Sequence, residues 1–201
     1  MKILAFTDMH GSPLAMKRIK QKVKKENPDL LVCAGDLSIF EHGIVGIMRK
    51  LNSLNKKIIS VHGNHEDNST FSKYSRMFSN IIFIHRNYFI EQNILFLGYG
   101  GDGFSVVDKK FEDFSQNKFK KWIKDNNGKK IVLVTHAPPY GTKLDKIGKN
   151  YCGNKSIAKF LRKNEIDCLI CGHLHENFCK EDKIGKTKMI NPGPFGKIVE
   201  V

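Results

Sequence analysis

Three short apolar runs in the first third of the chain each end in polar residues. The runs cover residues 2–7, 29–34 and 57–61, and helical patterns follow the first two at about 13–25 and 41–53. Alternation of buried strands with helices is typical of a parallel sheet that is covered by helices. Binding sites in such sheets form beyond the carboxyl ends of the strands. The sequence therefore predicts an α/β fold with its site at one sheet edge.

The later part of the chain predicts a second sheet with more antiparallel pairing. Gln92-Asn93 separates two apolar runs and predicts a two-residue hairpin turn. The glycine-rich segment 98–111 predicts a loop over the site, and Ser115 predicts the start of a helix that reaches about residue 126. The other expected elements are helices near 69–77 and 154–163, strands at 81–84, 130–135 and 167–171, and strand-like segments near 177–182, 186–190 and 196–201. We find no linker or repeat, so we expect one domain over residues 1–201.

Composition indicates an ordinary globular protein. The 201 residues are 40% hydrophobic and 27% charged, and no apolar run approaches the length of a membrane helix. A carboxylate at Asp8 comes too early for a signal peptide, so we expect a cytoplasmic protein without a membrane partner. The odd number of cysteines, five, fits a reducing compartment.

Two of these cysteines, Cys168 and Cys171, form a C-x-x-C pattern that invites a redox or zinc interpretation. The pattern lies in an apolar run that reads as a strand, where side chains three positions apart point to opposite faces. We therefore favour buried structural thiols over a shared metal or a disulfide.

The net charge of +14 raises nucleic acid as a partner. However, the basic residues are spread along the chain, and the dense run at 17–25 carries Ile19 and Val23 at helical spacing. A solvated helix face is therefore the favoured interpretation of that run, and nucleic-acid binding remains an alternative.

Five polar stretches follow apolar runs and supply carboxylates, an amide and imidazoles. They are Asp8-Met9-His10, Gly35-Asp36, Gly63-Asn64-His65-Glu66, His136, and Gly172-His173-Leu174-His175. A mixed set of oxygen and nitrogen ligands suits Mn²⁺, Fe²⁺, Ni²⁺ or Zn²⁺, and the absence of a cysteine disfavours a thiolate zinc site. We expect these stretches to meet at a pair of divalent ions.

The spacing within the stretches supports this expectation. A D-x-H unit at a strand end can place both side chains on one ion, and the single carboxylate of Asp36 can bridge two ions. His173 and His175 point the same way in extended backbone. Two ions about 3.5–4 Å apart can stabilise both the attacking and the leaving oxygen at phosphorus.

Each stretch taken alone has an ordinary interpretation as a cap, a turn or a loop. Because all five occur together at successive strand ends, we favour a shared functional site over coincidence. His42, His62 and His85 lie outside this pattern. We interpret His42 and His85 as structural residues, and His62 as a neighbour of the site that is not a ligand. The segment from Gly148 to Ser156 approximates a phosphate-binding loop, but its spacing is wrong and no apolar strand precedes it.

The ordered set D-x-H, G-D, G-N-H-E, H and G-H-x-H resembles the calcineurin-like metallophosphoesterase superfamily, from Asp8 to His175. Within it, the segments 135–143 and 182–194 resemble the loops of small archaeal and bacterial Icc-related phosphoesterases. The resemblance implies a four-layer αββα sandwich of two mixed β-sheets.

The resemblance also implies a role for each residue. The first metal ion would be held by Asp8, His10 and His175, and the second by Asn64, His136 and His173. Asp36 would bridge the two ions, together with a water or hydroxide that attacks phosphorus. His65 would be no ligand but a catalytic residue that stabilises the transition state or protonates the leaving oxygen. Asn64 and His65 would contact the substrate, and Glu66 would orient nearby groups.

We accordingly expect a metal-dependent hydrolase of a small-molecule phosphodiester or phosphomonoester, with two ions of Mn²⁺ as first choice and Fe, Ni or Zn as alternatives. Two other functions stay open: a nuclease, suggested by the positive charge, and a non-catalytic metal-binding scaffold. Relatives that became scaffolds lose the histidine that stands here as His65, which favours the enzyme. The natural substrate, the physiological metal and the choice between monomer and homo-oligomer are left open.

Overall fold

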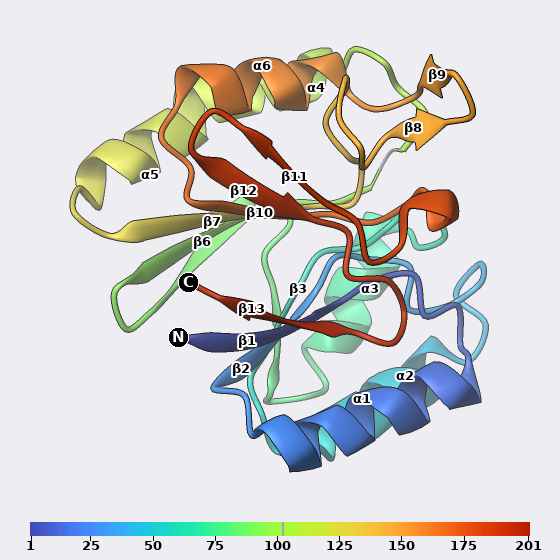
Figure 1. Ribbon diagram of the computed structural model, residues 1–201. Helices are drawn as coiled ribbons and strands as arrows, with labels where there is room; N and C mark the ends of the chain where they lie inside the picture. The colour runs from blue at the N-terminus through green and yellow to red at the C-terminus, as the bar shows by residue number, and fades with distance from the viewer. Residues whose placement is uncertain (102) are drawn as a thin grey trace.

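The computed structural model describes residues 1–101 and 103–201, and it contains two facing β-sheets with helices on their outer sides (Figure 1). The first sheet has the strand order β13-β1-β2-β3-β4. Its strands are β1 (Lys2–Phe6), β2 (Leu30–Cys33), β3 (Ile58–Ser60), β4 (Ile81–Phe83) and β13 (Lys197–Glu200). Neighbouring strands are parallel except β13, which pairs antiparallel with β1.

The second sheet has the order β11-β12-β10-β7-β6-β5. Its strands are β5 (Asn87–Glu91), β6 (Ile94–Tyr99), β7 (Lys130–Thr135), β10 (Cys168–Ile170), β11 (Glu181–Ile184) and β12 (Thr187–Ile190). The two edge pairs, β5 with β6 and β11 with β12, are antiparallel, and the central pairs are parallel. A small ribbon of β8 (Lys146–Ile147) and β9 (Asn150–Tyr151) lies apart from both sheets.

Helices cover the outer face of each sheet (Figure 1). The helices beside the first sheet are α1 (Pro13–Glu26), α2 (Ile44–Asn52) and α3 (Asn68–Ser75). Those beside the second sheet are α4 (Lys109–Phe114), the π-helical segment η1 (Ser115–Phe119), α5 (Lys120–Asp125) and α6 (Lys155–Lys163). Ser12 caps α1, because its hydroxyl accepts the backbone N–H of Ala15 at 3.2 Å. No helix among the described residues is long and apolar enough to cross a membrane.

Strand alternation creates three separate apolar layers. In β1, Ile3 and Ala5 face the second sheet, whereas Leu4 and Phe6 belong to the cluster that includes buried residues of α1 and α2. A third cluster joins the outer face of the second sheet to α4 and α6. Three apolar layers separate four layers of secondary structure, so the predicted αββα sandwich of two mixed sheets is confirmed.

The helix predicted to begin at Ser115 begins earlier. Asp108 is the N-cap of α4, and its carboxylate accepts the backbone N–H of Phe111 at 2.8 Å. The hydroxyl of Ser115 instead donates to the carbonyl of Glu112 at 3.1 Å, within a continuous run of helix from α4 to α5. The sequence interpretation placed too much of this segment in the glycine-rich loop.

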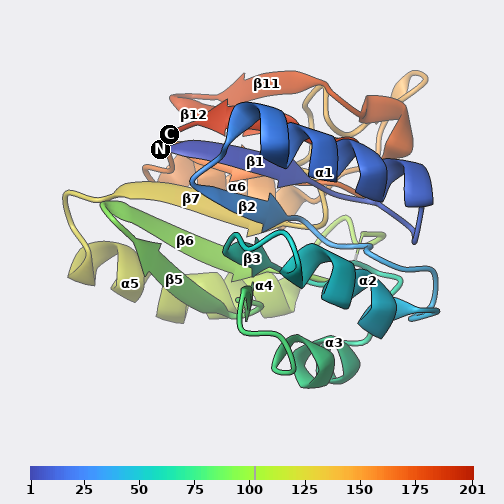
Figure 2. The same cartoon turned by 90° about the horizontal axis from the view of Figure 1, so that it is seen from below.

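The tail also differs from the expectation. The strand expected near 177–182 is β11, which starts at Glu181 after a short 3₁₀ turn, η2 (His175–Asn177). The last strand, β13, returns to the first sheet, which local sequence pattern did not indicate. As a result the two termini lie side by side in both views, and the amino group of Met1 donates to the carbonyl of Val201 at 2.8 Å (Figures 1 and 2).

Cys168 and Cys171 face opposite sides of the second sheet, as the strand interpretation required. Cys168 lies in the layer between the sheets, and Cys171 lies in the layer beneath α4 and α6. Burial raises the pKa of Cys168 to about 12, and it also raises the pKa of Cys171 well above the usual thiol range. Both residues are thus unreactive core thiols.

Candidate metal centre

All five polar stretches lie beyond the carboxyl ends of parallel strands at one end of the molecule. Figure 2 shows β1, β2, β6 and β7 pointing toward this common end. The first sheet contributes Asp8 and His10 after β1, Asp36 after β2, and Asn64 and His65 after β3, while the second contributes His136 after β7 and both His173 and His175 after β10. The site is therefore assembled from both sheets.

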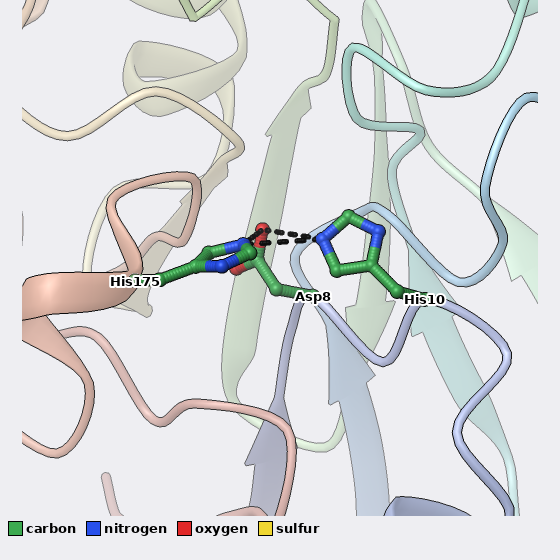
Figure 3. Close-up of side chains that lie close together, drawn as sticks. All are labelled: Asp8, His10 and His175. Atoms are coloured by element: carbon green, nitrogen blue, oxygen red, sulfur yellow. Dashed lines mark hydrogen bonds and ion pairs between the residues drawn. The ribbon is translucent and has the colours of Figure 1, made fainter.

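Asp8, His10 and His175 form one compact group (Figure 3). The two Nε2 atoms of His10 and His175 are 3.1 Å apart, and Oδ1 of Asp8 lies 3.9 Å and 3.6 Å from them. Ligand atoms at right angles around an ion, each at about 2.1 Å, lie roughly 3 Å apart. The spacing and chemistry of this group fit a divalent cation.

Asn64, His136 and His173 form a second group. The side-chain oxygen of Asn64 lies 2.9 Å from Nε2 of His136 and 2.9 Å from Nδ1 of His173. The other ring nitrogen of His136 lies 2.8 Å from the carbonyl of Ala34. This carbonyl can only accept, so it selects the tautomer in which Nε2 of neutral His136 has a free lone pair.

Asp36 stands between the two groups. Its Oδ2 lies 3.9 Å from Nε2 of His10 and 3.4 Å from Nε2 of His136. Its Oδ1 accepts the backbone N–H of His65 at 2.9 Å, which fixes the orientation of the carboxylate. One carboxylate oxygen therefore contacts both sets of candidate ligands.

The electrostatics of the metal-free site couple Asp36 to His136. Burial alone would raise the pKa of Asp36, but the hydrogen bond and charge of His136 and the N–H of His65 lower it to about 2. Burial alone would lower the pKa of His136, but the hydrogen bond and charge of Asp36 raise it to about 9. Without an ion, this buried imidazolium and carboxylate neutralise one another.

His65 lies beside the first group. Its ring centroid is 4.9 Å from that of His10 in an edge-to-face arrangement and 4.7 Å from that of Phe40. Its Nδ1 is buried, without a hydrogen-bond partner among the residues that the structure describes. Because His10, Asp36 and His65 also bring ligand atoms close together, geometry alone permits either a ligand or a catalytic role for His65.

Glu66 ties the loops of the site together. Its buried carboxylate accepts the backbone N–H groups of Asp36 at 3.1 Å, Gly63 at 3.0 Å and Ser38 at 2.8 Å, and also the hydroxyl of Ser38 at 3.0 Å. Burial raises the pKa of Glu66, and the hydrogen bonds oppose this effect. The orienting role expected for Glu66 thus has specific partners.

Three glycines of the motifs have no room for a side chain. A Cβ atom on Gly63 would lie 2.0 Å from Oδ1 of Asp36, and one on Gly172 would lie 2.5 Å from Oδ2 of Asp8. On Gly35 it would lie 2.6 Å from the backbone nitrogen of Gly63. The motif glycines allow the backbone and the candidate ligand side chains to approach one another closely.

Sequence reasoning did not single out Thr7, which contacts the site. The hydroxyl of Thr7 donates to Oδ2 of Asp8 at 2.7 Å. Gly103 lies so close to the imidazole of His173 that an added Cβ would be 2.4 Å from its Cε1 atom. The expected loop over the site is thus seen at Gly103, whereas residue 102 of that loop lies outside the described residues. The one sequence signal for the contact between Thr7 and Asp8 is the position of Thr7 at the end of the first predicted strand.

The three histidines outside the sequence pattern are not in the groups of close ligand atoms found among the described residues. His42 is exposed just before α2. His62 and His85 lie with their ring centroids 4.6 Å apart, and Nδ1 of His85 accepts the backbone N–H of Gly100 at 2.9 Å. These two rings support the segment that leads from β6 into the loop over the site.

Comparison with known proteins decides the family. Residues 1–177 match the calcineurin-like phosphoesterases. The chain belongs to this family. The resemblance inferred from the motifs is confirmed, and membership supports hydrolysis of phosphoesters. An uncharacterized protein of Methanocaldococcus jannaschii is 34% identical to this chain over an alignment that covers 96% of this chain and 88% of the relative.

Two solved structures are similar to this chain in fold. A protein of Thermus thermophilus has a TM-score of 0.76 at 14% identity, over 96% of this chain and 89% of that one. A dimetal phosphatase from Danio rerio has a TM-score of 0.67 at 11% identity, over 94% and 86% of the two chains. At such low identities the likeness concerns the fold alone.

Proposed function

We propose that this calcineurin-like phosphoesterase is a dinuclear metal-dependent enzyme that hydrolyses small-molecule phosphoesters, with phosphodiesters as the first choice. The observation that carries the proposal is the position of Oδ2 of Asp36 between the two ligand groups. A carboxylate oxygen that contacts both sets can serve two ions at once. Two such ions supply charge that stabilises the developing negative charge at phosphorus and lowers the pKa of water.

The ligand assignment follows the two groups. Asp8, His10 and His175 would hold one ion. Asn64, His136 and His173 would hold the other, and Asp36 would contact both. The donors are carboxylate, amide and imidazole, so Mn²⁺ is the first choice of metal and Fe, Ni and Zn are alternatives.

His65 would be the catalytic residue rather than a ligand. Its backbone is fixed by the bond to Asp36, and its imidazole lies at the border of the first group, half-buried rather than enclosed. From there it can donate a proton to the leaving oxygen or a hydrogen bond to the phosphate. Asn64, the neighbouring residue, would complete the contacts with the substrate.

The test uses protein stripped of metal and then loaded with Mn²⁺. We expect hydrolysis of bis(p-nitrophenyl) phosphate, and we expect His65→Ala to reduce kcat by roughly 10²–10⁴-fold, the usual contribution of general acid–base catalysis. Metal content per chain, measured by elemental analysis, should be the same in His65→Ala and the unaltered protein. A matched control is His42→Ala, because His42 is an exposed histidine outside the site.

Two results would overturn the proposal. The first is no hydrolysis of mono- or diesters with Mn²⁺, Fe²⁺, Ni²⁺ or Zn²⁺. The second is a loss of bound metal in His65→Ala, which would make His65 a ligand and return the catalytic role to another group.

A further inference from the structure

Two exposed phenylalanines lie directly against imidazoles of the site. The ring centroid of Phe40 is 4.7 Å from that of His65, and the ring centroid of Phe104 is 4.9 Å from that of His173. Phe40 is 70% exposed and Phe104 is 78% exposed. Burial of a large aromatic side chain stabilises a folded protein. These two side chains contribute little of that stabilisation, because most of their surface is exposed.

The backbone holds Phe40 in this position. Phe40 and Glu41 have left-handed φ angles of 45° and 66°, a conformation that a bulky residue rarely adopts. The loop is anchored on both sides, because Ser38 is bound to Glu66 and the carboxylate of Glu41 accepts the backbone N–H of Asp67 at 2.9 Å. Anchored, strained backbone that presents an exposed ring is typical of a functional surface rather than a packing element.

Phe104 is anchored in a comparable way. On one side Gly103 lies against the imidazole of His173. On the other side the amide of Asn154 donates to the carbonyl of Ser105 at 3.0 Å, and the backbone N–H of Lys155 donates to the carbonyl of Val106 at 2.8 Å. The exposed ring is therefore fixed beside the second ligand group by contacts from α6.

The placement of these rings limits the substrate. His65 borders the first ligand group and His173 belongs to the second, so a phosphate held between the groups has a phenyl ring near each side. An ester group of the substrate extends outward from that phosphate. A small polar group would leave both rings in water, whereas an aromatic group could pack on them.

We infer that Phe40 and Phe104 form a recognition surface for an aromatic group esterified to the substrate phosphate. The inference rests on the proposed function, because it takes the phosphate to lie at the two ligand groups. It narrows the substrate class to phosphoesters of aromatic alcohols or of small molecules that carry an aromatic ring.

The test compares two probes that lack an ester bond, phenylphosphonate and methylphosphonate. Their affinities for the Mn²⁺-loaded protein are measured by calorimetry, and the ratio of the two dissociation constants reports the aromatic contact alone. We expect phenylphosphonate to bind about tenfold more tightly in the unaltered protein. We expect the ratio to fall several-fold toward 1 in Phe40→Ala and in Phe104→Ala.

Met77→Ala is the control, because Met77 is an apolar residue that is 61% exposed, follows α3 and belongs to neither ligand group. Its ratio should equal that of the unaltered protein. An unchanged ratio in both phenylalanine variants overturns the inference, and so does an equal fall in Met77→Ala. Those outcomes leave the phosphoesterase proposal intact, whereas failure of both probes to bind, together with absence of ester hydrolysis, overturns the proposed function itself.

Discussion

At the scale of single residues, the site is built on left-handed backbone. Asp8, His10, Asp36 and His173 have φ angles of 51°, 47°, 52° and 72°. Such conformations cost about 1 kcal/mol or more for residues with a side chain, and they persist only where neighbouring contacts impose them. Here the backbone N–H of Asp8 donates to the backbone carbonyl of Gly35 at 3.0 Å, and that of His10 donates to the backbone carbonyl of Asp36 at 3.0 Å. The loops after β1 and β2 therefore fix one another.

Glu66 is the residue whose loss should disturb this arrangement most. In Glu66→Gln an amide NH₂ replaces one carboxylate oxygen, so the N–H groups that faced this oxygen lose their acceptor. We expect the free energy of unfolding of the metal-free protein to fall by about 2 kcal/mol, since hydrogen bonds to charged groups contribute roughly 1.5–3 kcal/mol. Urea denaturation measures the change.

The control for this variant is Glu165→Gln, an exposed carboxylate outside the site, which should alter stability by less than about 0.5 kcal/mol. Equal midpoints for Glu66→Gln and the unaltered protein would mean that the buried carboxylate is not needed to hold the loops.

At the scale of elements, local patterns predicted most strands and helices. Apolar runs gave β1, β2, β3 and β7 nearly as observed, because each of these strands is buried on both faces. The start of α4 was missed because the cap at Asp108 follows a loop rich in glycine. Caps depend on a single hydrogen bond, which the sequence offers at several competing positions.

Two substitutions distinguish the observed cap from the predicted one. Asp108→Ala removes the acceptor for the N–H of Phe111, and we expect a loss of about 1 kcal/mol, the usual value for a helix N-cap. Ser115→Ala should cost less, because the hydroxyl of Ser115 donates to a carbonyl inside a helix and caps nothing. Thermal and urea denaturation of both variants give the comparison.

Asp108→Asn is the matched control, because asparagine keeps the side-chain oxygen and is an equally good cap. It should restore most of the stability that alanine loses. A larger loss of stability in Ser115→Ala than in Asp108→Ala would indicate that the helix begins at Ser115.

At the scale of the whole molecule, the sequence indicated which residues come together at the candidate site, but not how the sheets bring them together. The strand-end positions of Asp8, Asp36 and His136 were visible as local pattern. The return of β13 to β1 and the contact of Phe104 with His173 join residues far apart in the chain, and no local periodicity encodes such contacts. The resemblance implied a bridging role for Asp36, and the structure adds the distances from its Oδ2 atom to one histidine of each group.

Because the proposed ligands come from both sheets, bound metal should act as a clamp between them. At a Mn²⁺ concentration about 100 times the dissociation constant, binding adds about 2.7 kcal/mol to stability. For a chain of 201 residues we expect a rise in Tm of about 5–10 °C relative to EDTA-treated protein. Differential scanning calorimetry with and without Mn²⁺ measures it.

Asp36→Asn should lose most of this rise, because it removes the charged oxygen that contacts both groups. Asp125→Asn, which alters an exposed carboxylate of α5, should keep it. The net charge of +14 disfavours non-specific binding of a divalent cation. An equal rise in Tm in both variants would therefore mean that the stabilising ion binds at another site.

The crowded glycines have a consequence for how this sequence can diverge. Gly103 is confined by the imidazole of His173, whereas Gly35 is confined chiefly by the backbone of Gly63. In a descendant that discarded His173, the restriction at Gly103 would vanish and larger residues could accumulate there. Gly35 would remain restricted, because no side-chain replacement moves a neighbouring main chain. A descendant that lost the phosphoesterase activity would therefore retain glycine at position 35 even after the proposed ligands had been replaced.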